Sequence, residues 1–448
     1  MPELRFYNVA PSAARLTDSL RDVGYDFPTA VADIVDNSIA AGASRVEIEI
    51  TFDGADSWVA VADDGAGMTP SGVLEALRYG SRRDYGRGDL GRYGLGLKTA
   101  SLSQCRSVTV VTRGSSPNAR TTARMIDLDL VAEFDEWVVA DPGPDEHVQR
   151  AREAVTGTGG TVVIWRKLDR VLPERNPDGG WARRRLDSLA VRTCEHLGIV
   201  FHRFLEGTTG DRLVITVNGE KVSAWNPFAP DEPSRTELPL QRYELSVGDV
   251  SGTVTFQGVV LPARDQFSSP GEFERLSGPL NWNRQQGLYV YRANRLVQWG
   301  GWGGVRGIDE HTKLARASLD FDSDLDLAFN INVAKMRVTM PPQLRQLLER
   351  PINELCLRAD DVYRKTSRRS DGAATTAVAA PPAEQLAIPF QRDTAPETVG
   401  RSTVGMLTAG LALRAAAMQA GEYDAWRRIM KALRADSPDV AAALGLDT

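Results

Sequence analysis

The hydrophobic period of the sequence changes at Arg45, and this change most narrows the folds that the chain can adopt. Residues 11–43 carry apolar side chains at helical spacing, which predicts a helical start. Apolar residues then alternate over 45–52, a polar turn follows at 53–54, and a second strand-like run covers 58–61. Helical segments and strands alternate further along, so we predict an α+β fold with helices on one face of a mixed sheet.

The length and the changes in composition predict four parts. A chain of 448 residues exceeds what one hydrophobic core usually serves. A long helical stretch at 181–205 closes a first domain, 1–207, and a series of strand-like runs followed by a helix forms a second domain, 208–366. Residues 367–400 are rich in Ala, Thr and Pro and predict a flexible linker, and 401–448 predict a small helical tail.

Charge and composition exclude several classes of protein. The formal charge of −6 gives no overall attraction to nucleic acid or to anionic lipid, so any DNA contact needs local patches. The three cysteines form no CxxC pair, and the four histidines lack metal-ligand spacing, so we expect neither disulfides nor a zinc site. No leader and no apolar run of membrane-spanning length is found, which predicts a cytoplasmic protein without a membrane partner.

The first motif with chemical meaning is Asp33-Ile-Val-Asp36-Asn37, on a predicted helix. Residues four apart lie about 40° apart around a helix, so Asp33 and Asn37 can reach one ligand. A carboxylate that polarises water and an amide oxygen that coordinates Mg²⁺ are what phosphoanhydride hydrolysis needs. The alternative is that these residues cap the helix or form a solvated face.

The second motif is Asp63-Asp64-Gly65-Ala66-Gly67-Met68, at the end of a predicted strand. Its glycines let the backbone approach a planar ligand, and a buried aspartate there can accept a hydrogen bond from an exocyclic amine. Asp-Gly pairs are also common turn formers, so a plain acidic turn is the alternative.

The third motif is a glycine-rich loop, 91–98, that opens a predicted helix with Lys98 at its start. Backbone N–H groups at a helix start, with a lysine beside them, are the usual arrangement for holding phosphates. The loop is not a Walker A loop, and it does not follow a strand as a dinucleotide fingerprint does. A flexible hinge is the alternative.

The order and spacing of the three motifs resemble the GHKL ATPase superfamily, which includes gyrase B subunits, MutL and MORC proteins, ninety-kilodalton heat-shock chaperones and histidine kinases. Residues 20–43 resemble the first box of the family, 61–68 the second and 91–101 the third. Gly160-Thr161 resembles the Gly-Thr pair that closes the adenine pocket. The resemblance implies a Bergerat-type ATP-binding α/β sandwich with ATP and Mg²⁺ as its ligands.

The resemblance also implies a role for each motif residue. Asp33 is the catalytic base, Asn37 holds Mg²⁺, and Asp63 and Thr161 bind adenine, while residues 69–93 form a lid. The further nucleotide-binding residues that it implies are Gly65, Gly67 and Met68 in the second motif, and Gly94, Leu95, Gly96, Leu97 and Lys98 in the third.

Two residues depart from the family pattern. Asp33 stands where the family has glutamate, and Ala40 stands where an aspartate is common. An aspartate reaches more than about 1 Å less far, and misplacement on that scale can lower a rate by about 100-fold. We therefore expect ATP binding with slow hydrolysis.

The second domain resembles MutL and MORC more closely than the other branches. Residues 330–338 are similar to the MutL segment whose lysine enters the ATP site from a βαβ transducer domain of ribosomal-protein-like fold. Residues 287–297 resemble the MutL and MORC strand before it. Lys335 is therefore the predicted γ-phosphate sensor, with a surface lysine at a strand end as the alternative. The resemblance covers residues 10–350.

The leading hypothesis is a nucleotide-gated clamp of MutL/MORC type that forms a homodimer on ATP binding. Family analogy suggests that it acts on DNA or in a defence complex, with separately encoded protein partners. Arginines within 82–92, 183–185 and 364–369 can give sequence-independent DNA contact, or they can be solvated surface charges. The other hypotheses are a slow or inactive ATP-binding scaffold and a chaperone-like ATPase.

Overall fold

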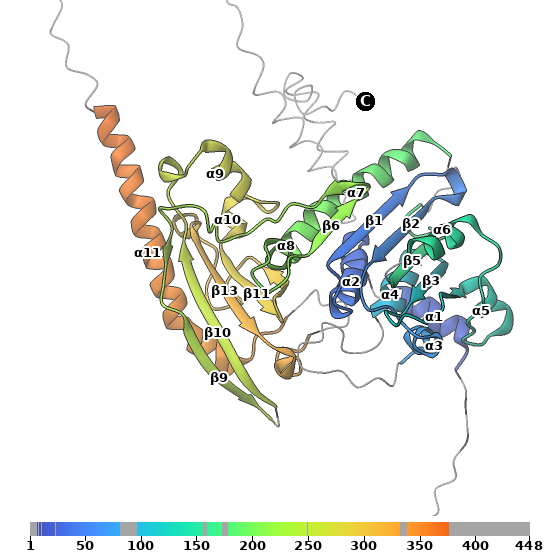
Figure 1. Cartoon of the computed structure of the whole chain (residues 1–448). Coiled ribbons are helices and arrows are strands. Elements are labelled where there is room, and N and C mark those ends of the chain that lie inside the picture. Colours follow the sequence, from blue (N-terminus) through green and yellow to red (C-terminus); the bar gives the residue numbers. More distant parts are fainter. Residues whose placement is uncertain are drawn as a thin grey trace, which may run out of the picture. The chain divides into compact units, whose positions relative to one another are not determined.

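Two β-sheets organise the part of the chain that this computed structural model describes (Figure 1). The described residues are 7, 9, 11–22, 24–80, 96–155, 159–172, 178–248, 250–331 and 338–375. Both sheets belong to one compact unit, Met1–Ala377. The predicted tail, and the predicted linker beyond residue 375, lie outside the described residues.

The first sheet has seven strands in the order β4-β3-β5-β2-β1-β6-β7. Neighbouring strands are antiparallel except β1 and β6, which are parallel. The alternating run after Arg45 is indeed half of a hairpin. The strands are β1 (Arg45–Thr51), β2 (Trp58–Asp63), β3 (Ser107–Arg113), β4 (Thr122–Asp127), β5 (Gly160–Arg166), β6 (Val214–Val217) and β7 (Glu220–Lys221).

The helices of this domain cover its central strands. They are α1 (Ala13–Arg21), α2 (Phe27–Ala40), α3 (Pro70–Leu77), α4 (Gly96–Leu102), α5 (Leu128–Phe134), α6 (Glu146–Ala154), α7 (Gly180–Val200) and α8 (His202–Glu206). A single 3-10 turn, η1 (Gly54–Asp56), forms the polar turn between β1 and β2.

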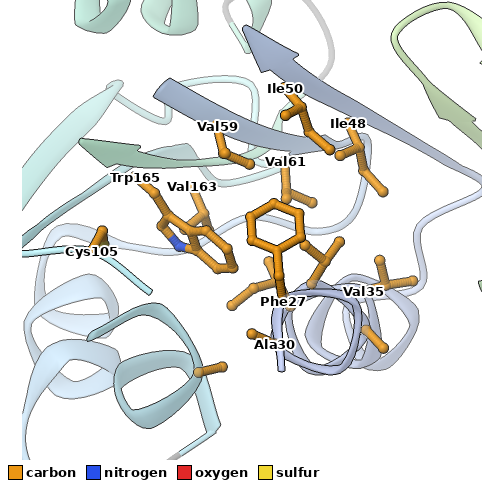
Figure 2. Close-up of a cluster of buried hydrophobic side chains, with 14 of the residues drawn as sticks. Phe27, Ala30, Val35, Ile48, Ile50, Val59, Val61, Cys105, Val163 and Trp165 are labelled. Carbon is orange, nitrogen blue, oxygen red and sulfur yellow. The ribbon is translucent and has the colours of Figure 1, made fainter. Parts of the chain in front are cut away.

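Helix α2 is the central element of the first domain. Asp26 caps its first turn by accepting a hydrogen bond from the Thr29 N–H, and Pro28 suits the helix start. Figure 2 shows Phe27 and its helical neighbours facing the apolar side chains of β1, β2 and β5. The helix also packs against α4 and α7, so almost all of it is buried.

The α+β character is confirmed, but the prediction that helices cover one face of the sheet was wrong. Val59 and Val163 face α2, whereas Trp58 and Val162 belong to a second apolar cluster with α6 on the opposite face. The continuous apolar run Val162–Trp165 of β5 is the signal for this, because a strand buried on both faces loses the alternation of a half-buried strand.

The second sheet has the order β12-β11-β13-β10-β8, with β9 paired to β10. Its strands are β8 (Thr236–Glu237), β9 (Gln241–Val247), β10 (Val250–Val260), β11 (Gly287–Arg292), β12 (Arg295–Trp299) and β13 (Ala315–Phe321). The helices are α9 (Pro270–Leu276), α10 (Asn281–Gln285) and α11 (Pro342–Thr375). The 3-10 turns are η2 (Arg264–Gln266), η3 (Glu310–Thr312) and η4 (Ser323–Leu325).

Several observations bear on the predicted domains. Strands β6 and β7 belong to the first sheet although they lie beyond residue 207, and α11 continues past residue 366 to Thr375. The parallel strands β11 and β13 are joined through β12 and an irregular segment with η3, without a helix. The predicted βαβ unit is therefore not confirmed in the described residues.

Helix α11 covers the second sheet along β10 and β13. Leu344, Leu348, Ile352, Leu355 and Ala359 recur at intervals of three or four and are fully buried, as an amphipathic helix requires. Among the helices that the structure describes, none combines the length and the apolar character needed to cross a membrane.

Candidate active site

The second motif forms a loop at the end of β2. The backbone of Asp63 pairs with Val46 of β1 on one side and with Thr161 of β5 on the other. Its carboxylate accepts hydrogen bonds from the Ser38 hydroxyl and from the Gly65 N–H, both at 3.0 Å. Burial raises the pKa of Asp63 above its ordinary value, and those hydrogen bonds offset part of the increase.

Two glycines allow the chain to pass close to this loop. Gly67 has a φ of +63°, and a Cβ there would lie 1.9 Å from the Arg113 carbonyl oxygen. Gly160 has a φ of +123°, and its Cβ would lie 2.1 Å from the Asp63 carbonyl oxygen. Neither position accepts a side chain, so both glycines are required by the local backbone.

A threonine that the sequence analysis did not single out ties the loop to the sheet. Thr112 of β3 accepts a hydrogen bond from the Met68 N–H at 2.9 Å and donates to the Gly160 carbonyl at 3.0 Å. Its hydroxyl lies 3.2 Å from that of Thr161, its cross-strand partner. The signal that could have identified Thr112 is that the two strand-like runs, β3 and β5, both contain threonine. Antiparallel pairing of these strands places Thr112 opposite Thr161.

At this end, the structure gathers five predicted nucleotide-binding residues around the adjoining ends of β2, β3 and β5. They are Asp63, Gly65, Gly67, Met68 and Thr161. We call this group, together with Thr112 and Gly160, the strand-end pocket.

The first motif lies on α2, where Asp33 is buried with 1% of its surface exposed. The Tyr25 hydroxyl donates to one carboxylate oxygen of Asp33 at 2.8 Å. Arg295 of β12 donates to the other oxygen at 3.4 Å. Burial and the Asp33 charge raise the pKa of Tyr25 far above its ordinary value, so this phenol remains a proton donor.

Asn37 lies one turn after Asp33 and is exposed. Its side-chain nitrogen donates to the Asp33 carbonyl at 2.9 Å, and its amide oxygen is the atom that can coordinate a cation. Within the described ranges, no group of three His, Cys, Asp or Glu side chains is placed to hold a metal ion. A Mg²⁺ ion fits Asn37 only if phosphate oxygens and water complete its coordination, which is common for Mg²⁺.

The third motif is described from Gly96 onward, so Gly94 and Leu95 lie outside the described residues. Gly96 begins α4 beside the first motif, because a Cβ on it would lie 3.9 Å from an Asp33 carboxylate oxygen. Leu97 is partly buried against the core.

Lys98 is buried, and its ammonium donates to the Ala76 carbonyl near the end of α3 at 2.8 Å. Loss of hydration lowers the pKa of Lys98 to about 8. In this structure the lysine satisfies a carbonyl in the last turn of α3. Its role at phosphates stays a prediction.

Other predicted residues fall outside the described part of the chain. They are Lys335, within 332–337, and most of the predicted lid, 81–93. The described beginning of that lid contains α3.

Asp36 belongs to the first motif, and Arg295 belongs to the segment 287–297 that resembles the MutL and MORC strand. The sequence predicted no role for either residue. The structure joins them: the Arg295 Nε donates to the Asp36 carboxylate at 2.8 Å, and both side chains are buried.

Comparison with known protein families assigns a family to part of the first domain. Residues 25–158 match the family described as histidine kinase-, DNA gyrase B- and HSP90-like ATPase. The matched segment therefore belongs to this family of ATPases, and ATP binding is its general property.

Two curated proteins are similar to part of the chain. DNA mismatch repair protein MutL of Paramagnetospirillum magneticum is 31% identical over 125 residues, which is 28% of this chain and 19% of that protein. Protein MICRORCHIDIA 5 of Arabidopsis thaliana is 32% identical over 106 residues, 22% of this chain and 15% of that protein. The chain thus matches less than a fifth of the length of each relative.

Proposed function

We propose that the protein is a slow, Mg²⁺-dependent ATPase of MutL/MORC type whose N-terminal domains form a homodimer when ATP binds. The observation that carries the proposal is the position of α2 in a matched ATPase domain. Its Ser38 contacts the strand-end pocket, Asn37 directly precedes Ser38, and Asp33 lies one turn before Asn37 on the same helix.

The strand-end pocket supports adenine recognition. The Asp63 carboxylate is fixed by Ser38 and Gly65 and can accept a hydrogen bond from the exocyclic amine of adenine. Gly67 and Gly160 let the backbone of the loop pack directly against the backbone of Arg113 and Asp63, which holds the acceptor in place.

The α2 residues support hydrolysis. Asp33 acts as the general base that removes a proton from the attacking water, while Asn37 contributes its amide oxygen to Mg²⁺. The bound ion supplies charge neutralisation at the phosphates. The side chain of Asp33 is one methylene shorter than the glutamate of the family pattern, so it reaches less far toward a water and turnover is slow.

The proposed setting is DNA or a DNA-processing complex, with separately encoded protein partners. One relative is by name a DNA mismatch repair protein, and Arg183, Arg184 and Arg185 are exposed at the start of α7. Arg364 forms an ion pair with Asp360, four residues away on the same helix, and it contributes less to a free basic surface. Contacts of this kind are independent of base sequence and sensitive to salt.

Steady-state ATP hydrolysis tests the proposal. We expect turnover that rises with duplex DNA at low salt, falls at moderate salt, and is lost in Asp33→Asn and Lys335→Ala. Light scattering with a non-hydrolysable ATP analogue should show a dimer. A monomer under these conditions contradicts the formation of a dimer on ATP binding. Wild-type turnover no higher than that of Asp33→Asn contradicts the proposed ATPase activity.

A second candidate is an ATP-binding scaffold that assembles protein partners without appreciable hydrolysis. The shortened side chain of the candidate base, Asp33, favours it. If Asp33→Glu raises turnover sharply while Asp33→Asn equals the wild type, the scaffold is the better description.

A further inference from the structure

Arg295 connects the two sheets through the candidate catalytic helix. It lies on β12 of the second sheet, has 2% of its surface exposed, and reaches two carboxylates on α2 of the first domain. Its Nε donates to Asp36 at 2.8 Å and its terminal nitrogen to Asp33 at 3.4 Å. These residues are 259 and 262 positions away in sequence, so the contact depends on how the two domains pack.

The two carboxylates require a partner of this kind. Asp33 and Asp36 lie three residues apart on one helix, and both are buried, so their like charges oppose each other in a poorly solvated place. One guanidinium that donates to both lowers this repulsion and fixes their rotamers. Removing the cation leaves two buried acids without that donor, which is strongly unfavourable.

The position of Arg295 is set by an interface beside it. Leu296 packs in an apolar cluster with Ile199 of α7 and with Tyr289 and Tyr291 of β11. The Tyr291 hydroxyl lies 2.8 Å from the ring nitrogen Nε2 of His202 in α8.

Arg203 of α8 extends the same interface. Its guanidinium lies 3.5 Å from the centre of the Tyr291 ring and pairs with Asp320 of β13. Sliding of the second sheet along α7 and α8 would therefore withdraw Arg295 from α2.

We propose that Arg295 is a positioning residue for the candidate base: it holds the Asp33 carboxylate in place and makes that placement depend on the seating of the second domain. This inference rests on the proposed ATPase function. Residues of the second sheet thereby regulate hydrolysis through a contact that does not involve the nucleotide.

The same hairpin provides a matched control. Arg292 is the cross-strand partner of Arg295 and is equally buried. It makes two hydrogen bonds to Asp326, at 2.7 and 2.8 Å, but that partner lies in the segment after β13 of its own domain. Replacing Arg292 therefore removes a buried ion pair with a residue of the second domain.

The test compares Arg295→Gln, Arg295→Lys and Arg292→Gln in the full chain by steady-state kinetics. We expect Arg295→Gln to lower kcat by about 10- to 100-fold while KM for ATP changes by less than about threefold. Arg295→Lys keeps the charge without the planar fork and should recover part of the loss. Arg292→Gln should lower thermal stability with kcat near the wild-type value. Equal kcat losses in Arg295→Gln and Arg292→Gln, or a loss confined to KM, would overturn the inference.

A second measurement does not depend on hydrolysis. We expect thermal unfolding of Arg295→Gln, Asp36→Asn and the double variant to be non-additive, with the double variant losing less than the sum of the single losses. Additive losses would overturn the ionic link. A wild-type protein without ATPase activity would refute the proposed function, whereas non-additive unfolding would still establish the link between the domains.

Discussion

The strand-end pocket and the Asp33 region of α2 are built from different kinds of interaction. The pocket consists of backbone pairs, close glycine contacts and short hydrogen bonds within the first sheet. Asp33 and Asp36 instead depend on buried charges, and their arginine comes from the second sheet. If the proposed function holds, we therefore expect nucleotide binding to be a local property of the first domain and hydrolysis to depend on both domains. The variants below should separate these properties.

The largest expected effect is at Gly67. Gly67→Ala places a methyl group 1.9 Å from the Arg113 carbonyl, so we expect a loss of about 3 kcal/mol in unfolding free energy and loss of nucleotide binding. Gly42→Ala is the control, because Gly42 has a similar φ of +72° but no atom near the new methyl group. That variant should lose only about 1 kcal/mol. Equal losses in chemical denaturation would show that the pocket is not sterically constrained.

A smaller effect is expected at Asp63. Asp63→Asn removes the proposed acceptor for adenine, so ATP affinity should fall by about 10- to 100-fold, equivalent to about 1.4 to 3 kcal/mol. Its neighbour Asp64 is exposed and binds Ser44 through its carboxylate, away from the pocket. Asp64→Asn should therefore bind ATP like the wild type in calorimetric titration. A comparable loss in both variants would contradict the assignment of adenine to Asp63.

The raised pKa of Asp63 gives a pH test of the same pocket. The Asp63 carboxyl binds its proton more tightly in the folded state than in the unfolded state. Ionised Asp63 therefore lowers the free energy of unfolding, and this loss disappears as the pH falls through the raised pKa. ATP affinity should fall over the same range, because the ionised carboxylate is the better acceptor. Titrations and melting curves taken from neutral pH down toward the ordinary aspartate pKa of about 3.9 should show both trends as differences between the wild type and Asp63→Asn. A constant difference would contradict the prediction.

The smallest effect near neutral pH is expected at Lys98, whose ammonium contacts the Ala76 carbonyl. Burial lowers the pKa of Lys98 to about 8 from 10.5, so between these pH values the unfolded state binds more protons than the folded state. The contribution of Lys98 to the free energy of unfolding therefore rises with pH from about 8 to 10.5. Lys98→Met should remove this rise and leave stability near pH 7 equal or greater. If Lys98 contacts phosphates when ATP binds, the variant should lose ATP affinity but keep adenosine affinity. Identical pH profiles for both proteins would show that the ammonium is not buried in solution.

The sequence predicted the local elements well, because they depend on short-range patterns. The helix around Asp33, the β1–β2 hairpin and the loop after Asp63 follow from periodicity and glycine spacing. These elements also bring Asp63 and Thr161 together as predicted, since they end neighbouring strands.

Long-range features could not be predicted in the same way. Helix α6 covers the second face of the sheet, and a continuous apolar strand does not show which helix will cover it. The contact of Arg295 with Asp36 joins residues 259 apart, and a single sequence contains no pattern that pairs them. Lys98 was assigned from its motif alone, but its side chain direction depends on where α3 ends.

The most direct test of the account measures ATP binding and ATP turnover together in Asp33→Asn. The account predicts that this variant binds ATP with near wild-type affinity, because the strand-end pocket is intact, and that its turnover falls to background. Turnover equal to the wild type, or loss of binding together with turnover, would contradict the separation of binding from hydrolysis.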